Sequence, residues 1–211
     1  MGLREKKAQR NRERIVSEAL ALFAGNGYEQ TTMESIAEAA ELSASTLYRY
    51  FPSKDLIVLQ RITDFTEQLA AVFAEYSLDH PVDEALGKAI FAVLRVEDER
   101  GAESLLVRRI IDESPIVRAR LWDYVAEQQQ QLGKAIAQRL RTKENDLRVI
   151  LTANLSMTVL GIAANLWRDS GGKQASRATA EELMRLLEEG AIVFPRAAKG
   201  KAKSRRAKAL R

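Results

Sequence analysis

The chain of 211 residues is 46% hydrophobic and 29% charged, a balance that is typical of a globular protein and excludes a wholly disordered one. It has no cysteine and a single histidine, His80, which excludes disulfides and thiolate chemistry and argues against a metal ion or any other cofactor. The net charge of +4 combines basic ends, residues 1–12 and 196–211, with an acidic body, a pattern that favours a polyanionic partner or, as the alternative, only improves solubility.

Apolar residues recur at spacings of three and four along nearly the whole chain, while the alternation typical of strands is scarce. We therefore predict an all-α fold. The first helix is expected over residues 9–24, where a Gly-Asn-Gly turn ends it. A second helix should begin after Thr32 as its N-cap, and a third should cover residues 45–51 and end before Pro52.

The remaining helices are longer and bring the expected total to about nine. We place them at residues 53–77, 82–97, 102–112, 115–140, 143–168 and 176–193. The chain then divides into a head of residues 1–52, a helical-bundle body of residues 53–195 and a basic tail of residues 196–211. The tail has no apolar face, and we expect it to be disordered.

The head has the pattern of a helix-turn-helix, because its second and third helices are short and only a three-residue turn joins them. Such a unit presents the second helix of the pair to the major groove of DNA. Leu47 and Phe51 lie four residues apart and should face inward. The hydroxyl, tyrosine and arginine side chains between residues 43 and 50 are then left outside, where Arg49 could pair with guanine.

These residues resemble the TetR-type bacterial regulators in the stretches 19–28, 31–37 and 43–55. The resemblance implies that matching positions touch DNA, with Lys54 on a phosphate; these positions are Thr32, Ser43, Ala44, Ser45, Thr46, Tyr48, Arg49, Tyr50 and Lys54. One departure is Glu41, which stands where the family usually has glycine. It either adopts a left-handed backbone or shifts the turn, at a cost of about 1 kcal/mol.

The resemblance also implies a dimer in which the last two helices pair across a two-fold axis. A dimer suits the function, because one short helix reads few base pairs. The apolar residues expected at this interface are Leu151, Leu155, Val159, Ile162, Leu183 and Leu187. The alternative is that these residues form ordinary intramolecular core.

A pocket for a small-molecule effector is expected among aromatic and polar residues of the body. The candidates are Phe65, Phe91, Arg109, Trp122, Gln128, Asn154 and Thr158. Asn154, Thr158, Gly161 and Asn165 form a polar stripe that either lines a cavity or meets its mate across the dimer. Residues 105–167 resemble the sensor domain of mycofactocin-system and related regulators, which implies an apolar or acyl-CoA-like ligand.

The leading interpretation is a ligand-responsive repressor that binds a palindromic operator as a homodimer. The alternative is an architectural protein of the nucleoid that uses its basic tail and has no effector. An enzyme is disfavoured because the sequence has no Ser-His-Asp set, no metal cluster and no phosphate-binding glycine loop. Since no segment approaches about 20 continuous apolar residues, we expect no membrane partner and a cytoplasmic, nucleoid-associated protein.

Overall fold

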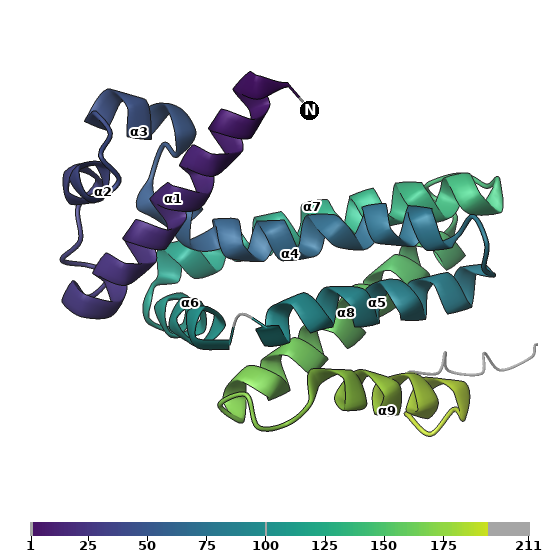
Figure 1. Cartoon of the computed structure of the whole chain (residues 1–211). Coiled ribbons are helices and arrows are strands. Elements are labelled where there is room, and N and C mark those ends of the chain that lie inside the picture. Colours follow the sequence, from purple (N-terminus) through teal and green to yellow (C-terminus); the bar gives the residue numbers. More distant parts are fainter. Residues whose placement is uncertain (1, 100, 194–211) are drawn as a thin grey trace, which may run out of the picture.

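A computed structural model describes residues 2–99 and 101–193, apart from the side chains of residues 3, 64–68 and 97. Within these ranges the fold is all-α, as predicted (Figure 1). The helices are α1 (Leu3–Asn26), α2 (Met33–Ala39), α3 (Ala44–Tyr50), α4 (Lys54–Tyr76), α5 (Val82–Glu99), α6 (Gly101–Glu113), α7 (Pro115–Leu140), α8 (Leu147–Asp169) and α9 (Ser176–Glu188). The basic tail, residues 196–211, lies outside the described residues.

The helix boundaries follow local capping. Helix α7 begins at Pro115, as predicted, because Ser114 accepts a hydrogen bond from the Val117 amide at 3.5 Å. It ends at Leu140, also as predicted, where Arg141 has a left-handed φ of 51°. Helix α8 begins four residues later than predicted. Asp146 caps it by accepting from the Arg148 amide at 2.9 Å, and the Arg148 guanidinium beside this carboxylate holds its pKa well below the usual range.

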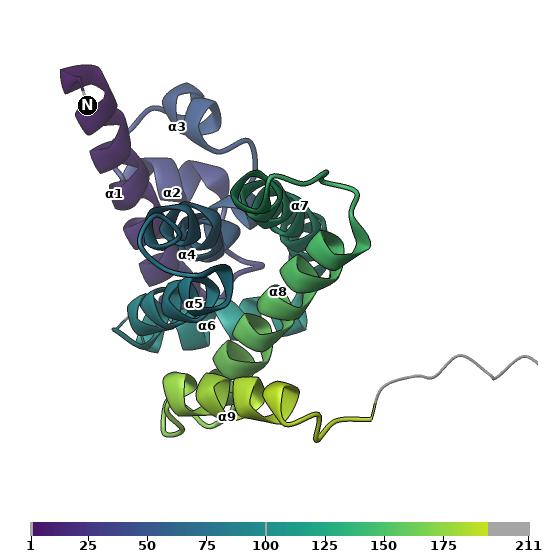
Figure 2. The same ribbon diagram turned by 90° about the vertical axis from the view of Figure 1, so that its right-hand side faces the viewer.

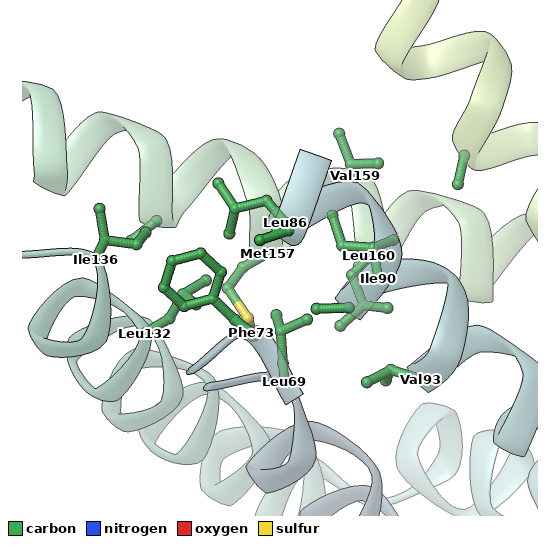
Figure 3. Packing of buried hydrophobic residues seen from close by; sticks show 14 of the residues in the cluster. Leu69, Phe73, Leu86, Ile90, Val93, Leu132, Ile136, Met157, Val159 and Leu160 are labelled. Atoms are coloured by element: carbon green, nitrogen blue, oxygen red, sulfur yellow. The ribbon is translucent and has the colours of Figure 1, made fainter. Parts of the chain in front are cut away.

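The body is built around α4, which runs out of the head and packs against α5 and α7 (Figure 1). Helices α8 and α9 pack against each other and also contact α5 (Figure 2). Figure 3 shows Leu69 and Phe73 of α4 among side chains of α5, α7 and α8, including Leu132 and Met157. These buried residues form one continuous core.

A second core joins the head to the body. It contains residues of α1–α4 together with Val107, Ile110 and Ile111 of α6 and Val117 of α7. The predicted boundary at residue 52 therefore does not separate two independent cores: the head packs against one side of α6.

Helix α8 is long and apolar enough to cross a membrane by length and composition, with a mean hydropathy of 1.7, so the expectation that no segment approaches a membrane span was wrong for this helix. In this fold, however, α8 packs against α5, α7 and α9, and the side chains of Ala153, Met157, Leu160 and Ala163 are buried in the body core. The high hydropathy of α8 is therefore explained by its packing as a core helix.

Candidate nucleic-acid interface

Helices α2 and α3 are fixed at their starts by side-chain caps. The Thr32 hydroxyl accepts from the Ser35 amide, and the Ser35 hydroxyl accepts from the Thr32 amide, both at 3.1 Å. Ser43 caps α3 by accepting from the Thr46 amide at 3.2 Å. Thr32 is the predicted N-cap, whereas α3 begins one residue earlier than expected because Ser43 supplies its cap.

The turn between the two helices depends on Glu41, whose φ of 51° lies in the left-handed region. This conformation lets the Leu42 amide donate to the Ala37 carbonyl at 2.8 Å and closes the end of α2. Of the two alternatives for Glu41, the structure shows the left-handed backbone. Its carboxylate lies 3.3 Å from the Arg14 guanidinium on the surface.

Helix α3 has the inner and outer faces that its sequence predicts. Leu47 is 0% exposed and Phe51, just beyond the helix, is 2% exposed. Tyr48 is 44% exposed, and Ser45 and Arg49 are exposed as well. The head packs its short helix on an apolar seam and leaves a polar, basic face uncovered, which is the arrangement of a helix-turn-helix.

The other candidates near α3 are less accessible. Ala44, Thr46 and Tyr50 are half-buried, and the Tyr50 hydroxyl accepts a hydrogen bond from the Asn11 amide group of α1 at 3.1 Å. The Ser43 hydroxyl lies 2.8 Å from the Thr46 hydroxyl in addition to its capping bond. Tyr50 thus also anchors α3 to α1.

Lys54 differs from its expected role. Its ammonium donates to the backbone carbonyls of Tyr28, Glu29 and Thr31 at 2.7, 3.2 and 3.1 Å, and it lies 4.4 Å from the centroid of the Tyr28 ring. These bonds use all three ammonium hydrogens. In this conformation Lys54 holds the loop between α1 and α2 and has no hydrogen left for a phosphate.

The head is tied to the body by two arginines. Arg12 of α1 donates to the Gln60 side chain at 3.2 Å, with its guanidinium 5.3 Å from the Phe51 ring centroid. Arg120 of α7 lies 3.2 Å from the carboxylate of Asp55, a buried residue in the first turn of α4. A cavity of about 320 Å³ lies at this junction, between α1, α3, α4 and α7. This cavity could not be predicted from the sequence, because its lining comes from segments that are far apart in the chain.

The structure does not bring the predicted effector residues together. Trp122 is 71% exposed, Arg109 and Thr158 are exposed, and Asn154 donates to the Ile150 carbonyl within its own helix. Phe91 packs at the body core beneath Arg177, Gln128 is buried, and the side chain of Phe65 lies outside the described residues. None of the six candidates with a described side chain lines the cavity at the head–body junction.

Helix α8 carries a row of exposed apolar side chains along the face turned away from the body core. Leu151 is 59% exposed, and Leu147, Ile150, Ile162 and Leu166 are exposed too. Leu155 is half-buried, and so are Leu183 and Leu187 of α9, which pack at the edge of the body core. Val159 is buried inside that core, so it faces away from this row.

Comparison with known proteins agrees with the head's geometry. Residues 15–60 match the profile of the bacterial regulatory proteins of the tetR family. The chain is 36% identical over 145 residues to the HTH-type transcriptional regulator TcmR of Streptomyces glaucescens, covering 65% of this chain and 64% of TcmR. It is 24% identical over 149 residues to MftR of Mycobacterium tuberculosis, named for mycofactocin biosynthesis, covering 71% and 74%. The chain thus spans somewhat less than two thirds of TcmR.

Solved structures share the fold. FadR of Thermus thermophilus, a TetR family transcriptional repressor solved with lauroyl-CoA, superposes with a TM-score of 0.53 at 24% identity, covering 90% of this chain and 99% of FadR. A TetR-family regulator of Syntrophomonas wolfei superposes with a TM-score of 0.66 at 19% identity, covering 89% and 99%. The family match covers residues 15–60, so the head and the start of α4 are similar to the bacterial regulatory proteins of the tetR family. The named relatives are regulators, which agrees with the expectation that this chain is not an enzyme.

Proposed function

We propose that the chain is a transcriptional repressor that binds a palindromic operator as a homodimer and responds to a small molecule. The observation that carries the proposal is the division of α3, whose Leu47 is buried while Tyr48 and Arg49 face solvent. An arginine in the major groove pairs with guanine through two hydrogen bonds, and tyrosine and serine hydroxyls bond to phosphates and base edges.

The proposed DNA contacts fall into two groups. Ser45, Tyr48 and Arg49 are exposed on α3 and are proposed to enter the groove. The capping residues Thr32 and Ser43 lie at helix starts, where backbone amides favour a phosphate, and Ala44, Thr46 and Tyr50 lie close beside them. Lys54 is left out of this set because its ammonium binds backbone carbonyls.

The proposed dimer surface is the apolar row of α8, with Leu183 and Leu187 of α9 at its edge. Leu151 and Ile162 lie on this row, three turns apart and both exposed. A row of this kind is costly to leave in water and would be covered in a dimer. Val159 is left out because it is buried within one chain. Two heads held together would read two half-sites at a fixed spacing.

The small-molecule response is supported by solved relatives and not by the residues expected from sequence. The Thermus thermophilus FadR structure holds lauroyl-CoA, and a Bacillus subtilis FadR structure, with a TM-score of 0.58 at 20% identity, holds stearoyl-CoA. An acyl-CoA-like effector is tested by thermal unfolding with lauroyl-CoA. Ligand at 100 times its dissociation constant should stabilise the fold by about 2.7 kcal/mol, and the absence of any shift would remove this ligand class.

The repressor proposal is tested by mapping the sites that the protein occupies on its own chromosome and measuring affinity for a recovered site. Tyr48→Ala and Arg49→Ala should each weaken binding by about 1–3 kcal/mol. Arg118→Ala removes an exposed arginine of α7 and serves as the matched control, with unchanged affinity. Full affinity in both α3 variants would contradict the proposal.

The same experiment separates a regulator from an architectural protein of the nucleoid. A regulator should prefer its own site to bulk genomic DNA by about a thousandfold or more, whereas an architectural protein should bind both alike with a steep salt dependence. Expression of a reporter behind the recovered site then decides between repression and activation.

A further inference from the structure

Helix α1 begins at Leu3 and not at residue 9, where it was expected, so the basic start of the chain is helical. The Glu5 carboxylate accepts a hydrogen bond from the Gly2 amide at 2.7 Å, which fixes the first turn. Figures 1 and 2 show the start of α1 and helix α3 at the same end of the molecule, away from α9. The exposed basic side chains of these first turns are Arg4, Lys6, Lys7 and Arg10.

Two contacts show which side of α1 faces the helix-turn-helix. The Asn11 side-chain amide donates to the Tyr50 hydroxyl at the end of α3, at 3.1 Å. The Arg14 guanidinium lies 3.3 Å from the carboxylate of Glu41, in the turn between α2 and α3. Asn11 and Arg14 are three residues apart and therefore lie on one side of α1. This is the side along which α3 is held.

Two basic side chains continue this side of α1 beyond α3. Lys7 and Arg4 precede Asn11 by four and seven residues, a spacing that places all three on one side of the helix. Both basic side chains are exposed. Arg4 lies about 10 Å from Asn11 along the helix axis, because each residue adds about 1.5 Å. The α1 stripe formed by Arg4, Lys7, Asn11 and Arg14 therefore continues past the point where Asn11 meets α3.

The first turns of α1 hold most of the basic charge that the head has left for a partner. Residues 1–54 contain eight basic and seven acidic side chains, so the head is nearly neutral as a whole. Arg12, Arg14 and Lys54 are already engaged by other groups of the chain. In the described part of the chain no ion pair holds the other five. Four of these lie in the first turns of α1, and the fifth is Arg49.

The acidic side chains of α1 do not cancel this charge. Glu5 and Glu13 each lie two residues from a member of the stripe, Lys7 or Asn11, and so project from the opposite side of the helix. Glu18 lies on the same side but about 16 Å from Lys7 along the axis, beyond a Debye length of about 8 Å in physiological salt. The two undescribed side chains at this end belong to a methionine and a leucine and carry no charge.

We infer that Arg4 and Lys7 of the α1 stripe bind the DNA phosphates that border the groove entered by α3. The major groove is about 12 Å wide, so side chains up to about 10 Å beyond the end of α3 meet the strand at its edge. Phosphate contacts carry no sequence information, so the stripe strengthens and orients binding without changing the preferred site. The inference rests on the proposed DNA-binding function and adds a second contact surface to it.

The test compares Arg4→Gln and Lys7→Gln with Lys6→Gln in the full chain. Lys6 is exposed too, but it lies on another side of the helix and is the matched control for the loss of one charge. Affinity is measured over a range of salt for a duplex with the recovered site and for a duplex of mixed sequence. Each stripe variant should lower the slope of log affinity against log salt by about 0.9 per lost contact, or about 1.8 for a dimer. Affinity at physiological salt should fall about tenfold on both duplexes, and Lys6→Gln should change it far less.

An unchanged salt slope in both stripe variants, or an equal loss of affinity in Lys6→Gln, would overturn the inference. Ethylation of single phosphates locates the contacts: modification at the edge of the groove should impair binding of the parent but not of Lys7→Gln, and the same pattern for both would also overturn it. A protein that prefers its own site but is indifferent to the stripe variants disproves only the stripe. A protein that prefers no site disproves the proposed function instead, and its salt slopes on the mixed-sequence duplex still test the stripe.

Discussion

Glu41 shows how a single residue can keep a motif at an energetic cost. The turn of the helix-turn-helix needs a left-handed backbone, and Glu41 adopts it with a φ of 51°. A side chain in this region is strained by about 1 kcal/mol, a cost that the closed turn and the packed Leu47 offset.

Glu41→Gly should therefore raise the free energy of unfolding by up to about 1 kcal/mol, because glycine adopts this φ without strain. The exposed ion pair with Arg14 is lost in the variant but contributes little. Urea unfolding measures the change. Glu41→Ala, which removes the same ion pair and keeps the strain, is the control and should not be stabilised; equal stabilisation of both variants would contradict the explanation.

Among the described residues, Asp98 is a carboxyl whose ionised form is disfavoured by folding, because it is partly buried. Because burial raises its pKa in the folded state above the usual 3.8, the folded protein binds this proton more tightly than the unfolded chain does. The stabilising effect of the bound proton is complete below the unfolded pKa and is lost as pH rises through the folded pKa.

Asp98→Asn should accordingly be more stable than the parent at neutral pH, where the parent buries a charge. The difference should shrink as the pH is lowered toward the raised pKa of Asp98. Urea unfolding of both proteins at neutral and mildly acidic pH checks this expectation. A stability difference that is the same at both pH values would show that the carboxyl does not titrate abnormally.

At the scale of elements, the caps explain why the short helices were predictable. Thr32 lies directly before the apolar pattern of α2, so its capping role could be predicted. The role of Lys54 could not, since its three carbonyl partners lie 23 to 26 residues earlier in the chain. Only folding brings the start of α4 to the loop between α1 and α2.

Lys54→Met should lower the free energy of unfolding by about 1–3 kcal/mol, because it leaves three loop carbonyls without their charged donor. It should also weaken DNA binding indirectly by loosening α2. Lys134→Met, at an exposed lysine of α7, is the matched control and should change neither quantity. If Lys54→Met weakened DNA binding without any loss of stability, Lys54 would instead contact the phosphate directly.

At the scale of the whole molecule, the apolar row of α8 is a surface that remains exposed to solvent in a single chain. Leu151→Asp or Ile162→Asp should convert a dimer to a monomer, because each places a charge in a surface that the partner would desolvate. Light scattering after size exclusion measures the mass. Leu78→Asp, at an 81% exposed leucine beyond α4, should leave the dimer intact. A parent protein that is already monomeric at micromolar concentration would disprove the proposed dimer.

The sequence by itself determined the all-α class, the order of the helices and the inner and outer faces of α3, because these depend on caps and on spacings within a few residues. Some bounds were wrong: α1 begins at Leu3 and not at residue 9, α8 begins at Leu147 and not at residue 143, and α9 ends at Glu188 and not at residue 193. Glu41 could also be recognised from the sequence as a departure from the usual glycine, because the turn is a local feature of the chain.

Only the tertiary structure decided which distant residues meet. Val159 is buried, whereas Leu151 on the same helix is exposed. The Lys54 ammonium binds backbone carbonyls. The described effector candidates lie apart from one another, and a cavity forms instead beside Asp98, Trp167 and Lys173. Periodicity shows that a helix has an apolar face, but not which neighbour covers that face. That choice depends on packing among segments far apart in the chain.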